Sequence, residues 1–311
     1  KILLNAVVAD GELTLKQRDK LLAEMTDDVA ALVLRDNTFQ NQVLAVMRSR
    51  GAALLDEQGR YMRHLSARGR LNRALEFLPD DDALVLRQQA GSGLTAPELA
   101  VLLAYHKMEL YDQVLASDVP EDSYIATSLQ RYFPARLHER FPGALQSHPL
   151  KREIIATHVV NSMVNRVGST FVHRLHEETG AAEPDIVRAY LATRQIFDLV
   201  LPWLATEALD NQVAEPTQNA IVLATVRLIE RATVWLLQQR DALRDIDTTI
   251  KRFAPGIAEV GAGLEHWLAA HERSALDAAT THWVAQGVPM ALAQRVARME
   301  AQVAGLDIVE V

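Results

Sequence analysis

Apolar residues recur along most of the chain at steps of three and four positions, which is the period of an α-helix buried on one face. The pattern is clearest at Val160, Val164, Val167, Phe171 and Leu175. The sequence contains no pair of alternating apolar segments joined by Asn-Gly or Asp-Gly, the usual signal of a β-hairpin. We therefore predict an all-α fold, a multi-helix, bundle-like array with short proline-rich connectors and no significant sheet.

Capping residues mark where several of these helices begin. Thr14 precedes a helix expected over 15–25, and Thr26 can cap the helix that follows. Thr95 and Glu98 have the spacing of a capping box, in which each side chain bonds to the backbone of the other residue. A helix is expected over 52–78, with a break near Gly69, and a short helix is expected to begin at Asp80. In the rest of the chain a helix with a kink at Pro202 is expected over 184–210. Further helices are expected over 150–178, 216–240, 242–252, 256–285 and 289–304.

Residues 117–149 form the expected connector, because prolines interrupt them repeatedly and leave room for one or two short helices. A chain of 311 residues is long enough for one large or two ordinary domains. Two arrangements therefore stay open. In the first arrangement the chain is subdivided into 1–116 and 150–311, and in the second all its helices share one core.

Composition narrows the classes of function. The formal net charge is −8, whereas nucleic-acid binding needs clustered Lys and Arg, so we expect no nucleic-acid partner. The absence of cysteine excludes disulfides, thiolate metal sites and Cys nucleophiles, and it fits a cytoplasmic location. Because no apolar run approaches the ~18 residues that a membrane helix needs, we expect no contact with a membrane.

No motif for cofactor or metal chemistry is complete. Gly91-Ser92-Gly93 and Gly261-Ala262-Gly263 both lack the third glycine of a dinucleotide-binding loop, and no strand is expected before either. His173 and His176 are three residues apart but lack the zincin order and a third ligand, which favours solvated histidines. We therefore expect no catalytic, cofactor-binding or metal-ligating residue in this chain.

The helix expected over 150–178 also carries a polar stripe. Two of its asparagines lie one helical turn apart, and amides at this spacing are costly to bury unless they are hydrogen bonded. Gly168, inside the same helix, is expected to cost about 1 kcal/mol relative to alanine. The stripe is either a solvated or capping face, or a polar seam against another helix, domain or subunit. The candidate residues of such a seam are Asn161, Asn165, Arg166, Arg174 and Glu177.

Two stretches of the sequence resemble the large bacterial NAD-dependent glutamate dehydrogenases. One runs from Gly93 to Tyr105, and the other from Asn161 to Phe171, continuing through Arg174 to Ala181. The opening, from Ile2 to Thr14, is similar to the stretch just after that family's catalytic core. The resemblance covers most of residues 1–240 and extends more weakly to the end.

The resemblance implies that residues 1–311 are a helical C-terminal domain of a much longer enzyme. That parent interconverts glutamate and 2-oxoglutarate plus ammonia with NAD, and its catalytic lysines, catalytic aspartate and Rossmann glycines lie before Lys1. The implied partners are the upstream catalytic domain of the same chain and further copies in a homo-oligomer. The expected role is to scaffold the catalytic core or the oligomer, with NAD bound in the parent enzyme and no cofactor in this chain. The alternative is an independent helical protein–protein interaction module, and a small-molecule effector site among the helices also stays open.

Overall fold

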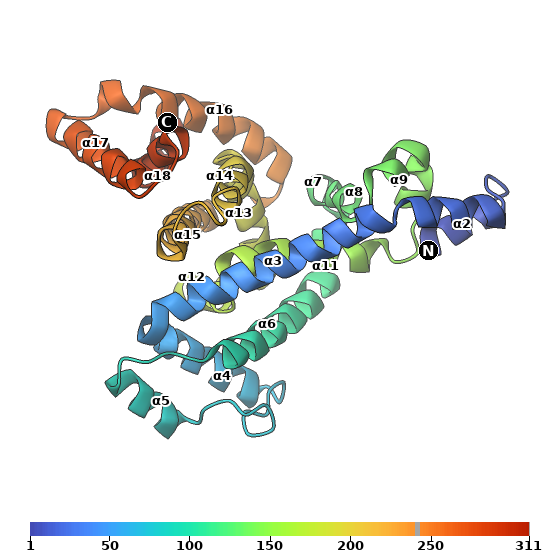
Figure 1. The fold of residues 1–311 in the computed structure, drawn as a ribbon, viewed down its shortest axis with the longest axis horizontal. Coiled ribbons are helices and arrows are strands. Elements are labelled where there is room, and N and C mark those ends of the chain that lie inside the picture. The colour runs from blue at the N-terminus through green and yellow to red at the C-terminus, as the bar shows by residue number, and fades with distance from the viewer. Residues whose placement is uncertain (240–242, 311) are drawn as a thin grey trace. The chain divides into compact units, whose positions relative to one another are not determined.

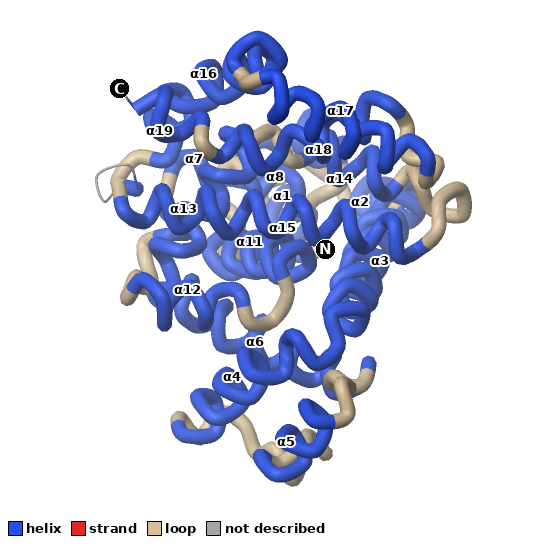
Figure 2. Tube along the Cα trace, turned by 90° about the vertical axis from the view of Figure 1, so that its left-hand side faces the viewer, coloured by secondary structure: helices blue, strands red, loops and turns tan. Residues whose placement is uncertain are grey.

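The computed structural model describes residues 1–239 and 243–310, and every regular element in these two ranges is a helix. Figure 2 shows these helices joined by loops. The prediction of an all-α array is therefore confirmed. None of the described helices combines the length and the apolar character that a membrane span requires.

The chain forms two compact units, each built from two separate stretches of sequence. Unit 1 comprises Lys1–Leu44 and Ala100–Ser169, and unit 2 comprises Ala45–Leu99 and Thr170–Val311. The connector 117–149 belongs to unit 1. The subdivision into 1–116 and 150–311 stays a prediction.

Unit 1 begins with two helices that pack on short helices from later in the chain. Its elements are α1 (Ile2–Ala9), α2 (Leu15–Glu24), the first part of α3 (Thr26–Arg50), most of α6 (Ala96–Ala116), η2 (Val119–Glu121), α7 (Ser123–Ala126), α8 (Ser128–Tyr132), α9 (Ala135–Arg140), α10 (Pro142–Gln146) and α11 (Lys151–Val167) (Figure 1). One apolar core joins α1 and α2 to α9 and α10, and it contains Leu3, Leu4, Val7, Leu13, Leu21, Met25, Leu137, Phe141 and Leu145.

The predicted cap at Thr14 is present. The Thr14 hydroxyl accepts a hydrogen bond from the Gln17 backbone N–H at 3.2 Å, and Gln17 Oε1 accepts one from the Thr14 N–H at 2.9 Å. These two bonds satisfy backbone donors that the first turn of α2 leaves without a helical partner.

The connector holds more helix than the one or two short helices that the prolines predicted. Pro120 lies in the first turn of η2 and Pro142 in the first turn of α10, while Pro134 directly precedes α9. A proline in these places removes no helical hydrogen bond and fixes φ at a helical value. These prolines therefore begin helices rather than only ending them.

Unit 2 is centred on α13, which is buried on nearly all sides. Its elements are η1 (Gly51–Leu54), α4 (Leu55–Ala67), α5 (Asp81–Gln89), α12 (Phe171–Thr179), α13 (Glu183–Ile196), α14 (Val200–Glu207), α15 (Glu215–Gln238), α16 (Ile246–Trp267), α17 (Ala270–Ala285), α18 (Met290–Val303) and α19 (Gly305–Glu310), with the end of α3 and the start of α6. α13 packs against α12, α15 and α16, and α18 packs against α15 and α17. On α13, Ile186, Val187, Ala189, Tyr190 and Ala192 are fully buried.

The single helix expected over 150–178 is wrong. Gly168 has a φ of +88° and ends α11, and α12 begins at Phe171. A residue with this φ cannot continue a right-handed helix, and glycine adopts the conformation without steric cost. Gly168 therefore separates two helices instead of weakening one.

The interruptions expected near Gly69 and at Pro202 are present, but the helices around them end at other places. α4 ends at Ala67, Gly69 has a φ of +67°, and the residues from there to 78 form no helix. α13 ends at Ile196, before Pro202, and Pro202 lies in the first turn of α14. α16 continues through Pro255, which is exposed to solvent, so water can satisfy the carbonyl that the proline leaves without a partner. The expected helix ends at 240 and 242 lie outside the described residues.

Candidate functional site

The five candidate seam residues do not share one helix. Asn161, Asn165 and Arg166 lie on α11 in unit 1, whereas Arg174 and Glu177 lie on α12 in unit 2. The structure thus divides the stripe into two groups with different surroundings. Their role in a seam with another domain or subunit stays a prediction.

The α11 group lies within unit 1. The Asn165 side chain is 3% exposed, and its Oδ1 has no hydrogen-bond partner among the described residues. The Arg166 guanidinium lies 4.0 Å from the centre of the Phe39 ring and 3.5 Å from Oε1 of Gln42, both on α3. Arg166 therefore joins α11 to α3 through a cation–π contact.

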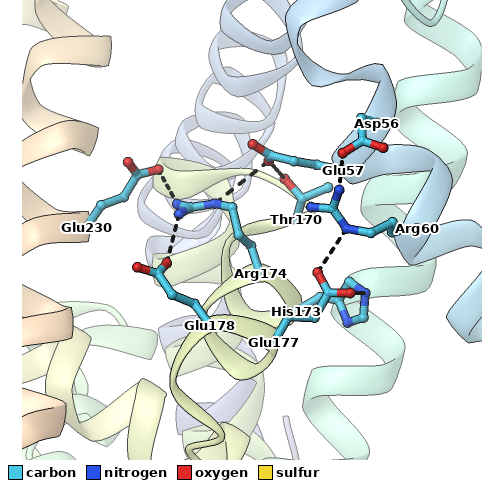
Figure 3. A network of polar contacts seen from close by, with 9 residues as sticks. All are labelled: Asp56, Glu57, Arg60, Thr170, His173, Arg174, Glu177, Glu178 and Glu230. Atoms are coloured by element: carbon cyan, nitrogen blue, oxygen red, sulfur yellow. Dashed lines mark hydrogen bonds and ion pairs between the residues drawn. The ribbon is translucent and has the colours of Figure 1, made fainter.

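The α12 group belongs to a network of charged contacts in unit 2, shown in Figure 3. Arg174 lies between carboxylates from three helices: its Nη2 is 2.5 Å from Oε1 of Glu230 on α15, its Nη1 is 3.6 Å from Oε2 of Glu178 on α12, and its Nε is 3.8 Å from Oε2 of Glu57 on α4. The Thr170 hydroxyl donates a further hydrogen bond to the Glu57 carboxylate at 3.0 Å. Arg174 thus connects α4, α12 and α15, and we call these five residues the Arg174 network.

A second arginine links α4 to α12 beside this network. Nε of Arg60 donates to Oε2 of Glu177 at 3.1 Å, and its Nη1 contacts the carboxylate of Asp56 one turn earlier. The side chains of Arg60 and Glu177 are each more than one-third exposed, and exposed ion pairs of this kind contribute at most about 1 kcal/mol. The Arg174 network is therefore the stronger of the two links.

Glu230 is a partly buried carboxylate of the network, and its surroundings shift its pKa. Removal from water raises the pKa of Glu230, and the nearby Arg174 guanidinium lowers it by a smaller amount. The 2.5 Å contact therefore does not fully offset the cost of removing the Glu230 charge from water. Glu230 depends on Arg174 for most of the compensation it receives.

The expectation of solvated histidines is wrong for His173. Its side chain is 9% exposed and packs against Tyr61 and His64, with ring centres 5.0 Å and 4.6 Å away. Burial lowers the pKa of His173, while the carboxylate of Glu177, 3.5 Å from Nε2, acts in the opposite direction. His176 is half-buried, and its Nδ1 is 2.9 Å from the Ala181 carbonyl oxygen. Within residues 1–239 and 243–310, no three His, Asp or Glu side chains are grouped so that they could hold a metal ion.

The lowered pKa of His173 predicts a loss of stability on acidification. As the pH falls, the unfolded chain takes up the proton first, at about pH 6.5, whereas the folded chain resists it. The stabilisation is therefore complete above the unfolded pKa and is lost as the pH falls through the folded pKa. We expect the melting temperature to fall between about pH 7.5 and about pH 5, and to fall less in His173→Phe, which keeps a ring between Tyr61 and His64. Equal slopes in the two proteins would contradict the prediction.

An open pocket of about 410 Å³ borders the Arg174 network in unit 2. Several of its polar groups pair with one another. Arg174 lies against Glu230 and Glu178, and the Trp235 indole N–H donates to Oδ1 of Asp307 at 2.6 Å. The effector site considered from the sequence stays a prediction.

Arg174 and Glu177 were predicted from the sequence, but their partners were not. Asp56 and Arg60 were detectable, because an acidic residue four positions before a basic one on a helix is a favourable pair. Glu57 and Glu230 gave no comparable signal, since each pairs with a residue more than fifty positions away in sequence. Only the packing of α4 and α15 beside α12 brings them to Arg174.

Comparison with known proteins identifies the family. Residues 91–311 match the family model described as glutamate dehydrogenase, C-terminal. The chain belongs to this family. Residues 1–47 match a second model, the catalytic domain of bacterial NAD-glutamate dehydrogenase. The match to the catalytic-domain model therefore reaches residue 47, whereas the sequence analysis placed the opening of the chain just after the catalytic core.

The chain is also similar to complete members of the family. It is 42% identical over 315 residues to the NAD-specific glutamate dehydrogenase of Halomonas elongata, 42% over 297 residues to that of Pseudomonas aeruginosa, and 37% over 309 residues to that of Mycobacterium tuberculosis. These alignments cover 100%, 96% and 99% of this chain but only 19%, 18% and 19% of the relatives. The chain thus spans about a fifth of the length of the relatives it matches.

Proposed function

We propose that this chain, including residues 1–47 that match the catalytic-domain model, is a non-catalytic helical part of a large NAD-specific glutamate dehydrogenase, where it scaffolds the catalytic core or the oligomer. The proposed parent reaction converts glutamate, NAD and water to 2-oxoglutarate, ammonia and NADH, with NAD bound by residues outside 1–311. We further propose that the parent is a cytoplasmic homo-oligomer and that the upstream catalytic domain of the same chain is the first partner.

The Arg174 network is the observation that carries the scaffolding role. Its charged side chains pair with one another and connect three helices that are far apart in sequence. Ion pairs between side chains of α4, α12 and α15 support a structural role, because they link helices that the sequence places far apart. The match of residues 91–311 to the C-terminal family model supports the same role.

The test compares the 311-residue chain with the full-length enzyme, using glutamate and NAD and following the absorbance of NADH. We expect turnover by the full-length enzyme and none by the 311-residue chain, after circular dichroism has shown that the chain is helical. Glutamate-dependent NADH formation by the chain alone would contradict the non-catalytic role.

A second measurement addresses the scaffolding role. In the full-length enzyme, Arg174→Met is expected to lower kcat or to reduce the size of the oligomer while the KM values for glutamate and NAD stay unchanged. Arg231→Met is the matched control, because Arg231 borders the same pocket and forms an ion pair with the exposed Glu300 at 3.6 Å. A rise in KM without any change in kcat or assembly would instead indicate a substrate-binding role for Arg174.

A further inference from the structure

The first half of α3 is exposed around most of its circumference, with Leu32 half-buried. No residue between Met25 and Val43 is buried, although this stretch includes the six consecutive apolar residues Val29–Leu34. Val29, Val33 and Leu34 are 46%, 55% and 64% exposed. Successive residues of a helix point about 100° apart, so six of them place apolar side chains around the whole circumference.

A helix that is apolar all round is normally buried. Residues 189–192 of α13 show the usual outcome, because this apolar turn of helix (Ala-Tyr-Leu-Ala) is buried within unit 2. A contiguous apolar surface left in water marks a place where another surface binds. Asp27, Asp28, Arg35 and Asp36 flank the run with charges of both signs, as in the polar rim of an interface.

The comparisons indicate what covers this surface. The whole run lies within residues 1–47, which match the catalytic-domain model, and the chain corresponds to only about a fifth of its relatives. We propose that Val29–Leu34 of α3 is a docking surface for the rest of the catalytic domain in the full-length enzyme. The inference rests on the proposed function, because the partner it names is the catalytic part of that enzyme.

The shape of the surface favours this partner over a second copy of the chain. Two helices that pair across a two-fold axis bury one stripe of each helix and leave the other sides in water. The apolar residues of α3 are distributed around the helix, so covering them requires contacts from several directions. A groove formed by elements of a larger domain provides such contacts.

Site-specific photo-crosslinking in the full-length enzyme tests the proposal. A benzophenone amino acid replaces Val33, and in a matched control it replaces Thr281, an exposed residue of α17. We expect position 33, and not position 281, to crosslink to peptides of the catalytic part outside residues 1–311. Crosslinks from position 33 only to residues 1–311 of another copy, or no crosslink, would overturn the proposal.

A charge substitution gives an independent measurement. Val33→Asp places a carboxylate in the proposed interface, and we expect it to lower glutamate turnover by the full-length enzyme by at least about tenfold, whereas Val33→Ile and Thr281→Asp leave it unchanged. Turnover by Val33→Asp equal to that of the unaltered enzyme would count against docking. Absence of glutamate oxidation by the unaltered full-length enzyme would instead defeat the proposed function, and the crosslinks would still report what α3 contacts.

Discussion

Arg174→Met is expected to lower the free energy of unfolding by about 2–4 kcal/mol, one of the two largest effects predicted for this chain. Methionine keeps most of the volume of the side chain but removes the charge. Glu230 and Glu57, whose side chains are 27% and 22% exposed, would then lose the cation that lies between them. The loss comes mainly from leaving partly buried carboxylates uncompensated, rather than from the attraction itself. Urea denaturation followed by circular dichroism measures it.

Two further variants separate this explanation from a general effect of removing an arginine. Arg231→Met, on the next helical position after Glu230, is expected to change stability by less than about 0.5 kcal/mol, because Glu300 is 91% exposed. Glu230→Gln in the Arg174→Met background should recover part of the loss, since it removes the buried charge that Arg174 no longer compensates. If Arg174→Met and Arg231→Met were equally mild, the network would not hold the three helices together.

The sequence was sufficient to predict helices, but it did not determine all of their ends. The Thr14 cap was predictable because its hydroxyl bonds to a residue only three positions away. The end of α11 was not, because an isolated glycine within an apolar repeat is compatible with either a continuous or an interrupted helix. The structure gives Gly168 a φ of +88°, which ends the helix and which glycine adopts without steric cost.

In the candidate site, too, features that depend on local sequence were predicted, whereas features that depend on contacts between distant segments were not. Arg174 and Glu177 belong to a stretch that resembles the family, and both form ion pairs across helices. The environment of His173 was mispredicted because α4, from more than one hundred positions earlier, covers it with Tyr61 and His64. Contacts with distant segments determine how deeply the His173 side chain is buried, and this burial lowers its pKa. Neither the burial nor the pKa shift could be predicted from the local spacing of residues.

The incomplete glycine motif argued against nucleotide binding at Gly93, but it did not explain why a glycine stands there. A Cβ atom built on Gly93 would lie 2.7 Å from both the carbonyl carbon and the carbonyl oxygen of Gly51. These are backbone atoms of η1, so no side-chain rotation can relieve the overlap. The close approach of two backbone segments within unit 2 therefore requires glycine at this position.

Gly93→Ala is accordingly expected to destabilise the protein by about 1–3 kcal/mol, since η1 and the loop before α6 must move apart. Gly143→Ala is the control, because Gly143 lies in α10 and a Cβ there meets no atom within 4 Å. Alanine favours helix more than glycine does, so this control should be neutral or more stable by up to about 1 kcal/mol. Denaturation midpoints of the two variants give the comparison. If Gly93→Ala were as stable as Gly143→Ala, the approach of Gly93 to the Gly51 backbone would not be a constraint on the fold.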